Sequence, residues 1–160
     1  MRLAKLFRIS FRYGMAGGIL AFVLLVAMYY MGRHPLVVSP FLDFRILLIG
    51  IFIFFSLKEF RDYDQEGVLY FSQAMLGGFV VVSCLSALAS LLVLVFASFE
   101  QDFVVQYIEQ VTAYVRGFSK EDIERIGKDV YQRNLEALPT TNAKELAITY
   151  FIHGLVIGFF

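Results

Sequence analysis

The chain has 160 residues, of which 59% are hydrophobic and 18% are charged, and 14 basic and 14 acidic residues cancel to a net charge of zero. A neutral total provides no overall attraction to nucleic acid, so we expect no nucleic-acid partner. The single cysteine, Cys84, excludes an intramolecular disulfide and a cysteine-based metal site.

The first apolar run covers residues 13–31 without a charged residue, and a basic arm of residues 1–12 precedes it. A helix rises about 1.5 Å per residue, so this run matches a hydrocarbon core about 30 Å thick. A signal peptide would need a cleavage site of small residues, and residues 26–30 provide a poor one. We therefore predict a retained transmembrane helix. The basic residues of the arm are Arg2, Lys5, Arg8 and Arg12.

The next link, residues 31–40, contains two prolines, each of which disfavours helix in the residue before it. It therefore predicts a short turn outside the membrane, in which we expect His34 to be solvated. We place Asp43 and Arg45 at the mouth of the second span that follows.

Two apolar runs, residues 41–57 and 74–99, flank a charged link at residues 58–67. This pattern predicts a second and a third span joined by a tight cytoplasmic turn. The charged residues form either an ion-pair clamp at the membrane interface or a docking site for a cytoplasmic partner. We favour the clamp, because opposite charges at helical spacing support a helix end. The residues concerned are Lys58, Glu59, Arg61 and Asp62.

Small residues recur in the apolar runs, with four-residue spacing at Gly14 and Gly18 and again at Gly154 and Gly158. Such residues let helices approach closely in a membrane. We expect these faces to pack within the chain before they form dimer interfaces, and we expect Cys84 to be a packing residue. The third run contributes Gly77, Gly78, Ser83, Ser86, Ala87 and Ser90.

Residues 100–144 have an amphipathic pattern, with apolar residues every three or four positions along residues 104–118 and 123–137. They predict a hairpin of two helices, separated by an N-cap at Ser119, whose apolar seams close on each other and on the membrane surface. Three tyrosines offer surplus aromatic surface, either for a partner or as an aromatic belt at the lipid headgroups. They are Tyr107, Tyr114 and Tyr131.

Residues 146–160 begin a fourth apolar run, which covers only about 22 Å as a helix. We therefore expect this span to be incomplete in the given chain. His153 lies inside it, one turn from Tyr150, and an ionisable group within a span is a functional candidate. The alternative that we favour for His153 is a neutral imidazole that is hydrogen-bonded to a nearby Ser, Tyr or carbonyl group.

Basic residues concentrate on the cytoplasmic side of membrane proteins, and the basic arm carries four of them. This predicts two cytoplasmic termini and an extracytoplasmic hairpin at residues 100–144. The expected fold is all-α, with residues 1–160 forming a single integral membrane domain. We expect a four-helix bundle with spans at about residues 13–31, 41–57, 74–99 and 146–160, and the amphipathic hairpin between the third and fourth spans.

One part of the chain carries a family pattern: Leu-Lys-Glu-Phe-Arg-Asp at residues 57–62, then Gly67, then Phe-Ser-Gln-Ala at residues 71–74. With Asp102, Phe103 and Tyr107 after the third span, this pattern resembles the DUF4199 family. The family often has a proline after that aspartate, where this chain has Phe103, and the short fourth span is a second departure. Its members are small four-span proteins found mainly in Bacteroidota. The resemblance therefore implies a multi-pass bacterial inner-membrane protein, and it implies no particular activity.

The sequence contains no P-loop, no G-x-G-x-x-G, no H-E-x-x-H and no G-x-S-x-G motif. No nucleophile is paired with a base in the apolar runs, so we expect no enzyme, no cofactor and no metal site. Our first hypothesis is a non-catalytic scaffold or modulator of a membrane partner. The alternative is a small transporter or channel component, which would normally carry a carboxylate inside a span. The expected partners are the lipid bilayer and either another membrane protein or a second copy of the chain.

Overall fold

The computed structural model describes residues 2–32, 34–37 and 43–159, and every regular element in these ranges is helical. The all-α prediction is therefore confirmed for the described residues. Seven α-helices and one short 3-10 helix follow one another along this part of the chain. They are α1 (Arg2–Tyr30), α2 (Arg45–Asp64), α3 (Phe71–Phe99), α4 (Gln101–Arg116), α5 (Lys120–Ile126), α6 (Lys128–Ala137), η2 (Leu138–Thr140) and α7 (Ala143–Phe159).

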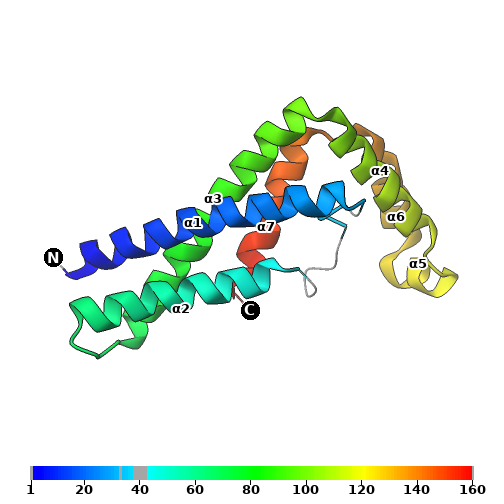
Figure 1. Ribbon diagram of the computed structural model, residues 1–160. Coiled ribbons are helices and arrows are strands. Elements are labelled where there is room, and N and C mark those ends of the chain that lie inside the picture. The colour runs from blue at the N-terminus through cyan, green and yellow to red at the C-terminus, as the bar shows by residue number, and fades with distance from the viewer. Residues whose placement is uncertain (1, 33, 38–42, 160) are drawn as a thin grey trace.

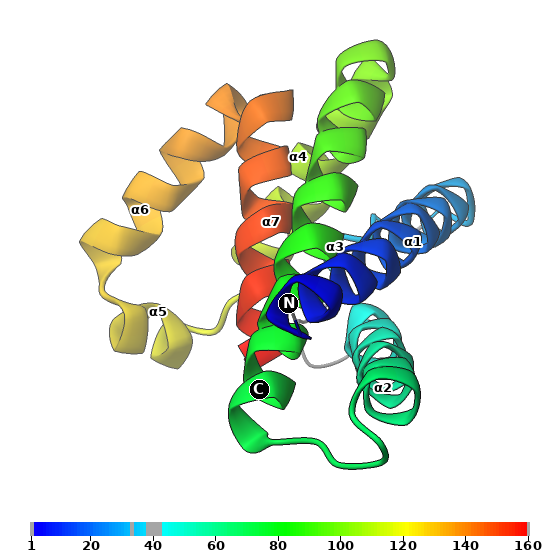
Figure 2. The same cartoon turned by 90° about the vertical axis from the view of Figure 1, so that its left-hand side faces the viewer.

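Four longer helices form the body of the molecule. α1 and α2 run antiparallel side by side, α3 crosses α1, and α7 runs back along α3 (Figure 1). The shorter helices α4, α5 and α6 lie beyond the end of α1 (Figure 1). Figure 2 shows α5 and α6 standing away from α1 and α2.

The hydrophobic core joins α1, α2, α3 and α7 and continues into the start of α4. Leu85 of α3 and Phe103 of α4 are fully buried in it. A second, smaller cluster joins α1 to α2 near the basic arm. It contains Leu6, Ile9 and Phe60, and the first and last of these have no exposed surface. Apolar packing therefore extends along the whole length of α1.

Glycines make the closest helix contacts of the core. A Cβ atom added to Gly14 of α1 would lie 2.6 Å from the Cβ atom of Cys84 in α3, closer than real Cβ atoms approach. Gly18 of α1, and Gly154 and Gly158 of α7, face α3 in the same way. The prediction that these glycine pairs pack within the chain is therefore confirmed.

The small residues of α3 divide between two neighbouring helices. Cys84 faces α1, Gly77 lies against both α1 and α2, and Ser86 and Ser90 face α7. Ser90 Oγ donates a hydrogen bond of 2.6 Å to the carbonyl oxygen of Ala147. Ser90 thus joins α3 to α7 by a hydrogen bond as well as by packing.

The charged link is mostly helical, which corrects the predicted turn. α2 continues to Asp64, and the chain reverses direction only between α2 and α3. In that connection Glu66 and Gly67 have φ angles of 53° and 87°. Glycine adopts such a positive φ without steric penalty, which favours the reversal here. The helix extends further than predicted because acidic residues in its last turns bind α1, as described below.

The segment between α3 and α7 contains three α-helices rather than the predicted two. The N-cap at Ser119 is confirmed, since its Oγ accepts a hydrogen bond of 3.1 Å from the amide of Asp122. The predicted second helix is interrupted at Gly127, where φ is 95°. The apolar spacing predicted one continuous helix here, because a single glycine leaves the spacing of the neighbouring apolar residues unchanged.

Among the described residues, two helices are long and apolar enough to cross a membrane, namely Leu3–Tyr30 within α1 and Phe71–Phe99, which is α3. α2 and α7 have 20 and 17 residues, and α2 carries charged residues near both ends. The predicted four-span bundle is therefore taken up below as a proposal. Residues 33 and 38–40 of the predicted turn, and the predicted start of the second span at residue 41, lie outside the described residues.

Candidate functional site

A polar cluster lies inside the bundle where α2, α3 and α7 meet. Its centre is an ion pair between Asp43 and Arg45, whose side chains are only 5% and 3% exposed. Arg45 Nε donates to Asp43 Oδ2 at 2.6 Å, and the Arg45 backbone N–H donates to Asp43 Oδ1 at 2.9 Å. The carboxylate thus binds both the guanidinium group and the first backbone amide of α2 with charge-assisted hydrogen bonds.

Arg45 also binds α7. Its Nη1 donates to the carbonyl oxygen of Tyr150 at 2.9 Å, and its Cζ lies 4.0 Å from the centre of the Tyr150 ring. A guanidinium group over an aromatic face gains a cation–π attraction, which is stronger away from water. A Cβ atom added to Gly154 would collide with Ser86 and lie 3.7 Å from Arg45 Nη1. Glycine at this position therefore lets the three helices meet.

Two hydroxyl groups beside this ion pair have no hydrogen-bond partner among the described residues. They belong to Ser86 and Tyr150, and both are buried. A buried hydroxyl without a partner costs about 1–3 kcal/mol, so its retention calls for an explanation. His153 lies one turn further along α7 and is half-buried. The cluster thus combines groups that can pass a proton or bind a small polar solute.

Two members of this cluster were predicted from the sequence, and its centre was not. Tyr150 and His153 were candidates, whereas Asp43 and Arg45 were placed at the mouth of the second span. The structure buries both charged residues, because the chain enters α2 at the level of Tyr150, well inside the bundle. The available signal was the spacing Asp-x-Arg at the start of an apolar run, since two opposite charges this close neutralise each other and can be buried together.

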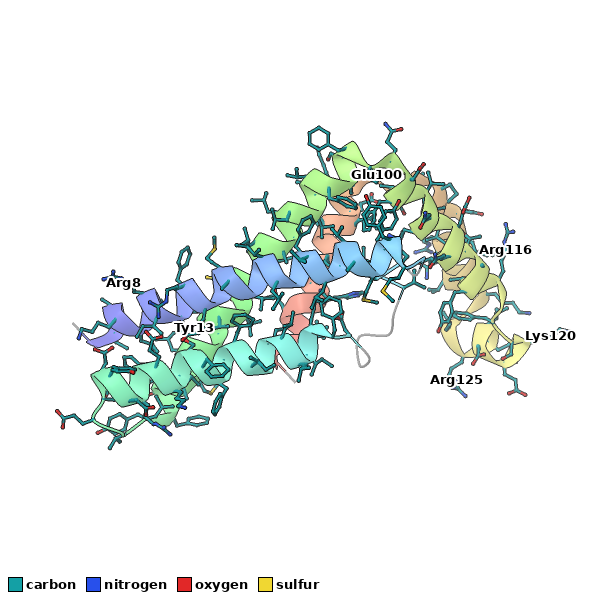
Figure 3. The ribbon with its side chains drawn as sticks, viewed as in Figure 1. Arg8, Tyr13, Glu100, Arg116, Lys120 and Arg125 are labelled. Atoms are coloured by element: carbon teal, nitrogen blue, oxygen red, sulfur yellow. The ribbon has the colours of Figure 1, made fainter. Side chains whose placement is uncertain are left out.

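Acidic residues of α2 bind the basic arm of α1. Glu59 accepts hydrogen bonds of 2.6 Å at both carboxylate oxygens from Nη2 of Arg12, and one of 2.8 Å from the hydroxyl of Tyr13. Asp64 accepts a hydrogen bond of 2.5 Å from Nζ of Lys5. Figure 3 shows Tyr13 on the side of α1 that faces α2. These contacts join the two helices at the end of the molecule where α1 begins.

The other three residues of the predicted clamp do not reach α1. Arg61 pairs with its neighbour Asp62 at 2.7 Å on the surface of α2. The hydrogen bond and the charge of Arg61 lower the pKa of Asp62 below its usual value. Lys58 forms no ion pair with another described residue. Within the predicted set, Glu59 is thus the residue that ties α2 to α1, and a clamp made by all four stays a prediction.

His34 is buried, which corrects the expectation that it is solvated. Its Nδ1 accepts from the Leu36 amide at 3.3 Å, which assigns the ring hydrogen to Nε2, and Nε2 donates to the Phe103 carbonyl at 3.1 Å. The His34 amide also donates to the side chain of Gln110 at 3.1 Å. Burial lowers the pKa of His34 to about 4, so the imidazole is neutral near pH 7. His34 therefore fixes the connection after α1 to α4.

The three tyrosines predicted for an interface have different surroundings. Tyr107 is half-buried, and its ring centre lies 5.2 Å from that of His34, so it belongs to the contact just described. Tyr114 is 66% exposed and packs edge-on against Phe118. Tyr131 is half-buried in α6. Of the three, Tyr114 offers the most free aromatic surface.

Potential metal ligands are dispersed over the molecule. Among the described residues, no three His, Cys, Asp or Glu side chains come close enough to hold a metal ion. Cys84 is a free, half-buried thiol on the side of α3 that contacts Gly14. The polar groups that do converge in the bundle are therefore those around Asp43 and Arg45.

Residues 12–160 match the family model described as "Protein of unknown function (DUF4199)". The chain belongs to this family. The match covers nearly the whole chain and confirms the resemblance that the charged link carries. It includes the polar cluster and the hairpin of this DUF4199 protein. No curated protein and no solved structure matches the chain. The family description assigns no activity, so the function has to be argued from the geometry.

Proposed function

We propose that this chain is a multi-pass bacterial inner-membrane protein that acts as a non-catalytic scaffold or modulator. In this proposal it binds a membrane-protein partner through the hairpin of α4, α5 and α6. The observation that carries the proposal is that α5 and α6 bury none of their residues. Helices with so small a core of their own gain stability when another surface covers their apolar side chains.

The tip of the hairpin has the composition of a binding surface. A hollow of about 530 Å³ lies there, and its lining includes Tyr114, Phe118 and Ile126. Tyr114 and Ile126 are exposed. Aromatic and aliphatic side chains surrounded by charged groups are typical of the residues that contribute most to protein–protein binding. The charged side chains that project at this end of the molecule include Arg116, Lys120 and Arg125 (Figure 3).

The directions of the helices support a four-span arrangement. α1 and α3 run from the basic arm toward the hairpin, whereas α2 and α7 run back. With 20 and 17 residues, α2 and α7 are about 30 Å and 26 Å long. The positive arm then belongs in the cytoplasm, together with both termini, and the hairpin belongs on the outer side.

The topology is tested by thiol labelling in intact cells, in a variant in which Cys84 is replaced by alanine. We expect an impermeant reagent to label a cysteine placed at Gln132 in α6 and to leave one placed at Glu66 unlabelled. Both positions are exposed in the folded chain, so accessibility within the protein is matched. Labelling at Glu66 with protection at Gln132 would contradict the proposed orientation.

The partner is tested by photo-cross-linking in native membranes from a reactive phenylalanine analogue at position 114. We expect a defined protein adduct that is absent when the analogue replaces Tyr63, an exposed tyrosine of α2 outside the hairpin. The adduct should also be lost when Ile126→Glu is added while the protein still folds. An adduct of twice the chain mass would identify a second copy as the partner. If the analogue labels only lipid, and Tyr114→Glu lowers the inserted amount, the tyrosines form an aromatic belt and the scaffold proposal fails.

A small transporter or channel component is the second candidate, and the buried Asp43–Arg45 pair favours it. The sequence predicted no carboxylate inside a span, whereas the structure buries Asp43 against Arg45, whose guanidinium group also binds Tyr150. Purified protein in liposomes with an internal pH dye provides the test. Proton flux that Asp43→Asn abolishes and Asp62→Asn leaves intact would support transport, and no flux above empty liposomes would reject it.

A further inference from the structure

Arg8 differs from Lys5 and Arg12, its neighbours in the basic arm. Lys5 and Arg12 bind Asp64 and Glu59, whereas Arg8 has no ion pair or hydrogen bond with another described residue. Figure 3 shows Arg8 on the side of α1 opposite Tyr13. Its guanidinium group is therefore free to bind an anion from outside the protein.

An open groove with a volume of about 450 Å³ runs along α1 and α3 from Arg8 toward the middle of the bundle. Among the described residues that line it, Arg8 is the only charged one. Three phenylalanines near Arg8 are each about half exposed, namely Phe7, Phe11 and Phe79. The groove then continues along α3 to Cys84. It has the size of a ligand site and an apolar wall with one polar end.

On its other side Arg8 borders a polar hollow of about 470 Å³ between α1 and α2. Three basic and two acidic side chains line this hollow, so one positive charge remains without a counter-charge. The acidic residues are those already bound by the neighbouring basic residues. The charge of Arg8 thus stands where the polar hollow meets the apolar groove.

We propose that Arg8 and this groove form a binding site for an anionic phospholipid. The phosphate binds the guanidinium group of Arg8, and one acyl chain lies along the phenylalanines toward Cys84. Arginine matches phosphate geometry with two parallel N–H donors, and basic residues next to a span attract anionic lipids. A zwitterionic lipid would place a second positive charge near Arg8 and would bind less well. The inference rests on the membrane location proposed above and is independent of any partner of the hairpin.

The site is tested by native mass spectrometry of the full chain released from detergent micelles that contain either phosphatidylglycerol or phosphatidylcholine. We expect one phosphatidylglycerol to bind in preference to phosphatidylcholine. Arg8→Gln should weaken phosphatidylglycerol binding about fivefold, as expected for one basic residue near a membrane surface. Arg116→Gln is the matched control, because it removes an exposed arginine from the far end of the molecule and should leave binding unchanged.

A second variant tests the groove separately. Ser83→Phe narrows the groove without changing its charge and should reduce the binding of both lipids. Equal phosphatidylglycerol binding by wild type and Arg8→Gln would overturn the proposal. Inorganic phosphate that competes as well as the lipid would show an anion site that needs no acyl chain, and would overturn it too. If no protein adduct forms at position 114, the scaffold proposal is rejected, but the lipid-binding result is unaffected.

Discussion

The two ends of the molecule are held together in different ways. Where α1 begins, apolar residues such as Leu6 and Phe60 are fully buried, and Glu59 joins α2 to α1. At the other end, α5 and α6 bury no residue, and the contacts of His34 and Phe103 position the start of α4. One end is therefore stabilised by its own packing. The other is attached at its base and leaves its tip free for another surface.

The largest loss of stability is expected between the two ends, at the buried polar cluster of Asp43 and Arg45. Arg45→Met leaves the carboxylate of Asp43 buried without its partner, which should lower the free energy of unfolding by about 3–5 kcal/mol. Thermal unfolding in detergent, followed by far-UV circular dichroism, measures this loss. Arg61→Met is the control, since Arg61 pairs only with its exposed neighbour. Equal losses in the two variants would contradict the role assigned to the cluster.

Acid is expected to destabilise the contact between His34 and the start of α4. The unfolded chain protonates His34 near pH 6.5, whereas the folded chain resists protonation until about pH 4. The free energy of unfolding should therefore be unaffected by His34 above pH 6.5 and should fall by up to about 3 kcal/mol toward pH 4. Unfolding midpoints measured across this range should drop less in His34→Gln. The same pH dependence in both proteins would rule out His34 as the cause.

Close helix packing can be tested with a single methyl group. Gly14→Ala would bring a Cβ atom within 2.6 Å of Cys84 Cβ and 2.9 Å of the Val81 carbonyl, so α1 and α3 must separate. We expect a loss of about 1–3 kcal/mol in thermal unfolding. Gly50→Ala on α2 meets no atom within 4 Å and should be neutral or stabilising. Indifference to Gly14→Ala would show that the helices are less tightly packed than the glycine contacts indicate.

The ion pairs between α1 and α2 should matter less than the packing beneath them. Glu59→Gln removes the charge that Arg12 and Tyr13 bind, and Asp62→Asn removes one that only Arg61 binds. We expect a small drop in the unfolding temperature for the first variant and almost none for the second, with the difference shrinking at high salt. A larger drop for Asp62→Asn would favour a wider clamp along α2.

The smallest effect on stability is expected at the tip of the hairpin. Tyr114 is exposed and packs only against Phe118, so Tyr114→Glu should leave the unfolding temperature nearly unchanged in detergent. Its effect should be seen in partner binding instead. A clear loss of stability would show that the tip is packed more tightly than its exposure indicates.

Most of the helical architecture follows from patterns that are local in the sequence. Uncharged runs predict α3 and the part of α1 that follows the basic arm, whereas α1 itself begins at Arg2. Glycine spacing predicts the contacts of these helices, and the cap at Ser119 predicts the start of α5. The break at Gly127 escaped prediction, because a glycine can be helical or adopt a positive φ and only the surrounding structure decides which.

The candidate site could be predicted only in part. Tyr150 and His153 stood out because polar residues are rare inside an apolar run. Asp43 and Arg45 did not, because their burial depends on where α7 passes, and that contact joins residues 105 positions apart. His34 was misjudged for the same reason, since its partner Phe103 lies 69 positions away. Long-range packing leaves no periodic signal in a single sequence.

The hydrogen bond from Arg45 to the carbonyl of Tyr150 has a consequence for the flexibility of α7. In an α-helix that same oxygen also accepts from the amide four residues later, which here belongs to Gly154. One carbonyl oxygen thus accepts from two donors. One of these donors is the amide of Gly154, and glycine has the lowest helix propensity of all residues except proline. α7 should therefore bend most easily at this level, with the arginine able to hold the carbonyl while the amide hydrogen bond lengthens. Faster hydrogen exchange at the Gly154 amide than at its neighbours would report this compliance.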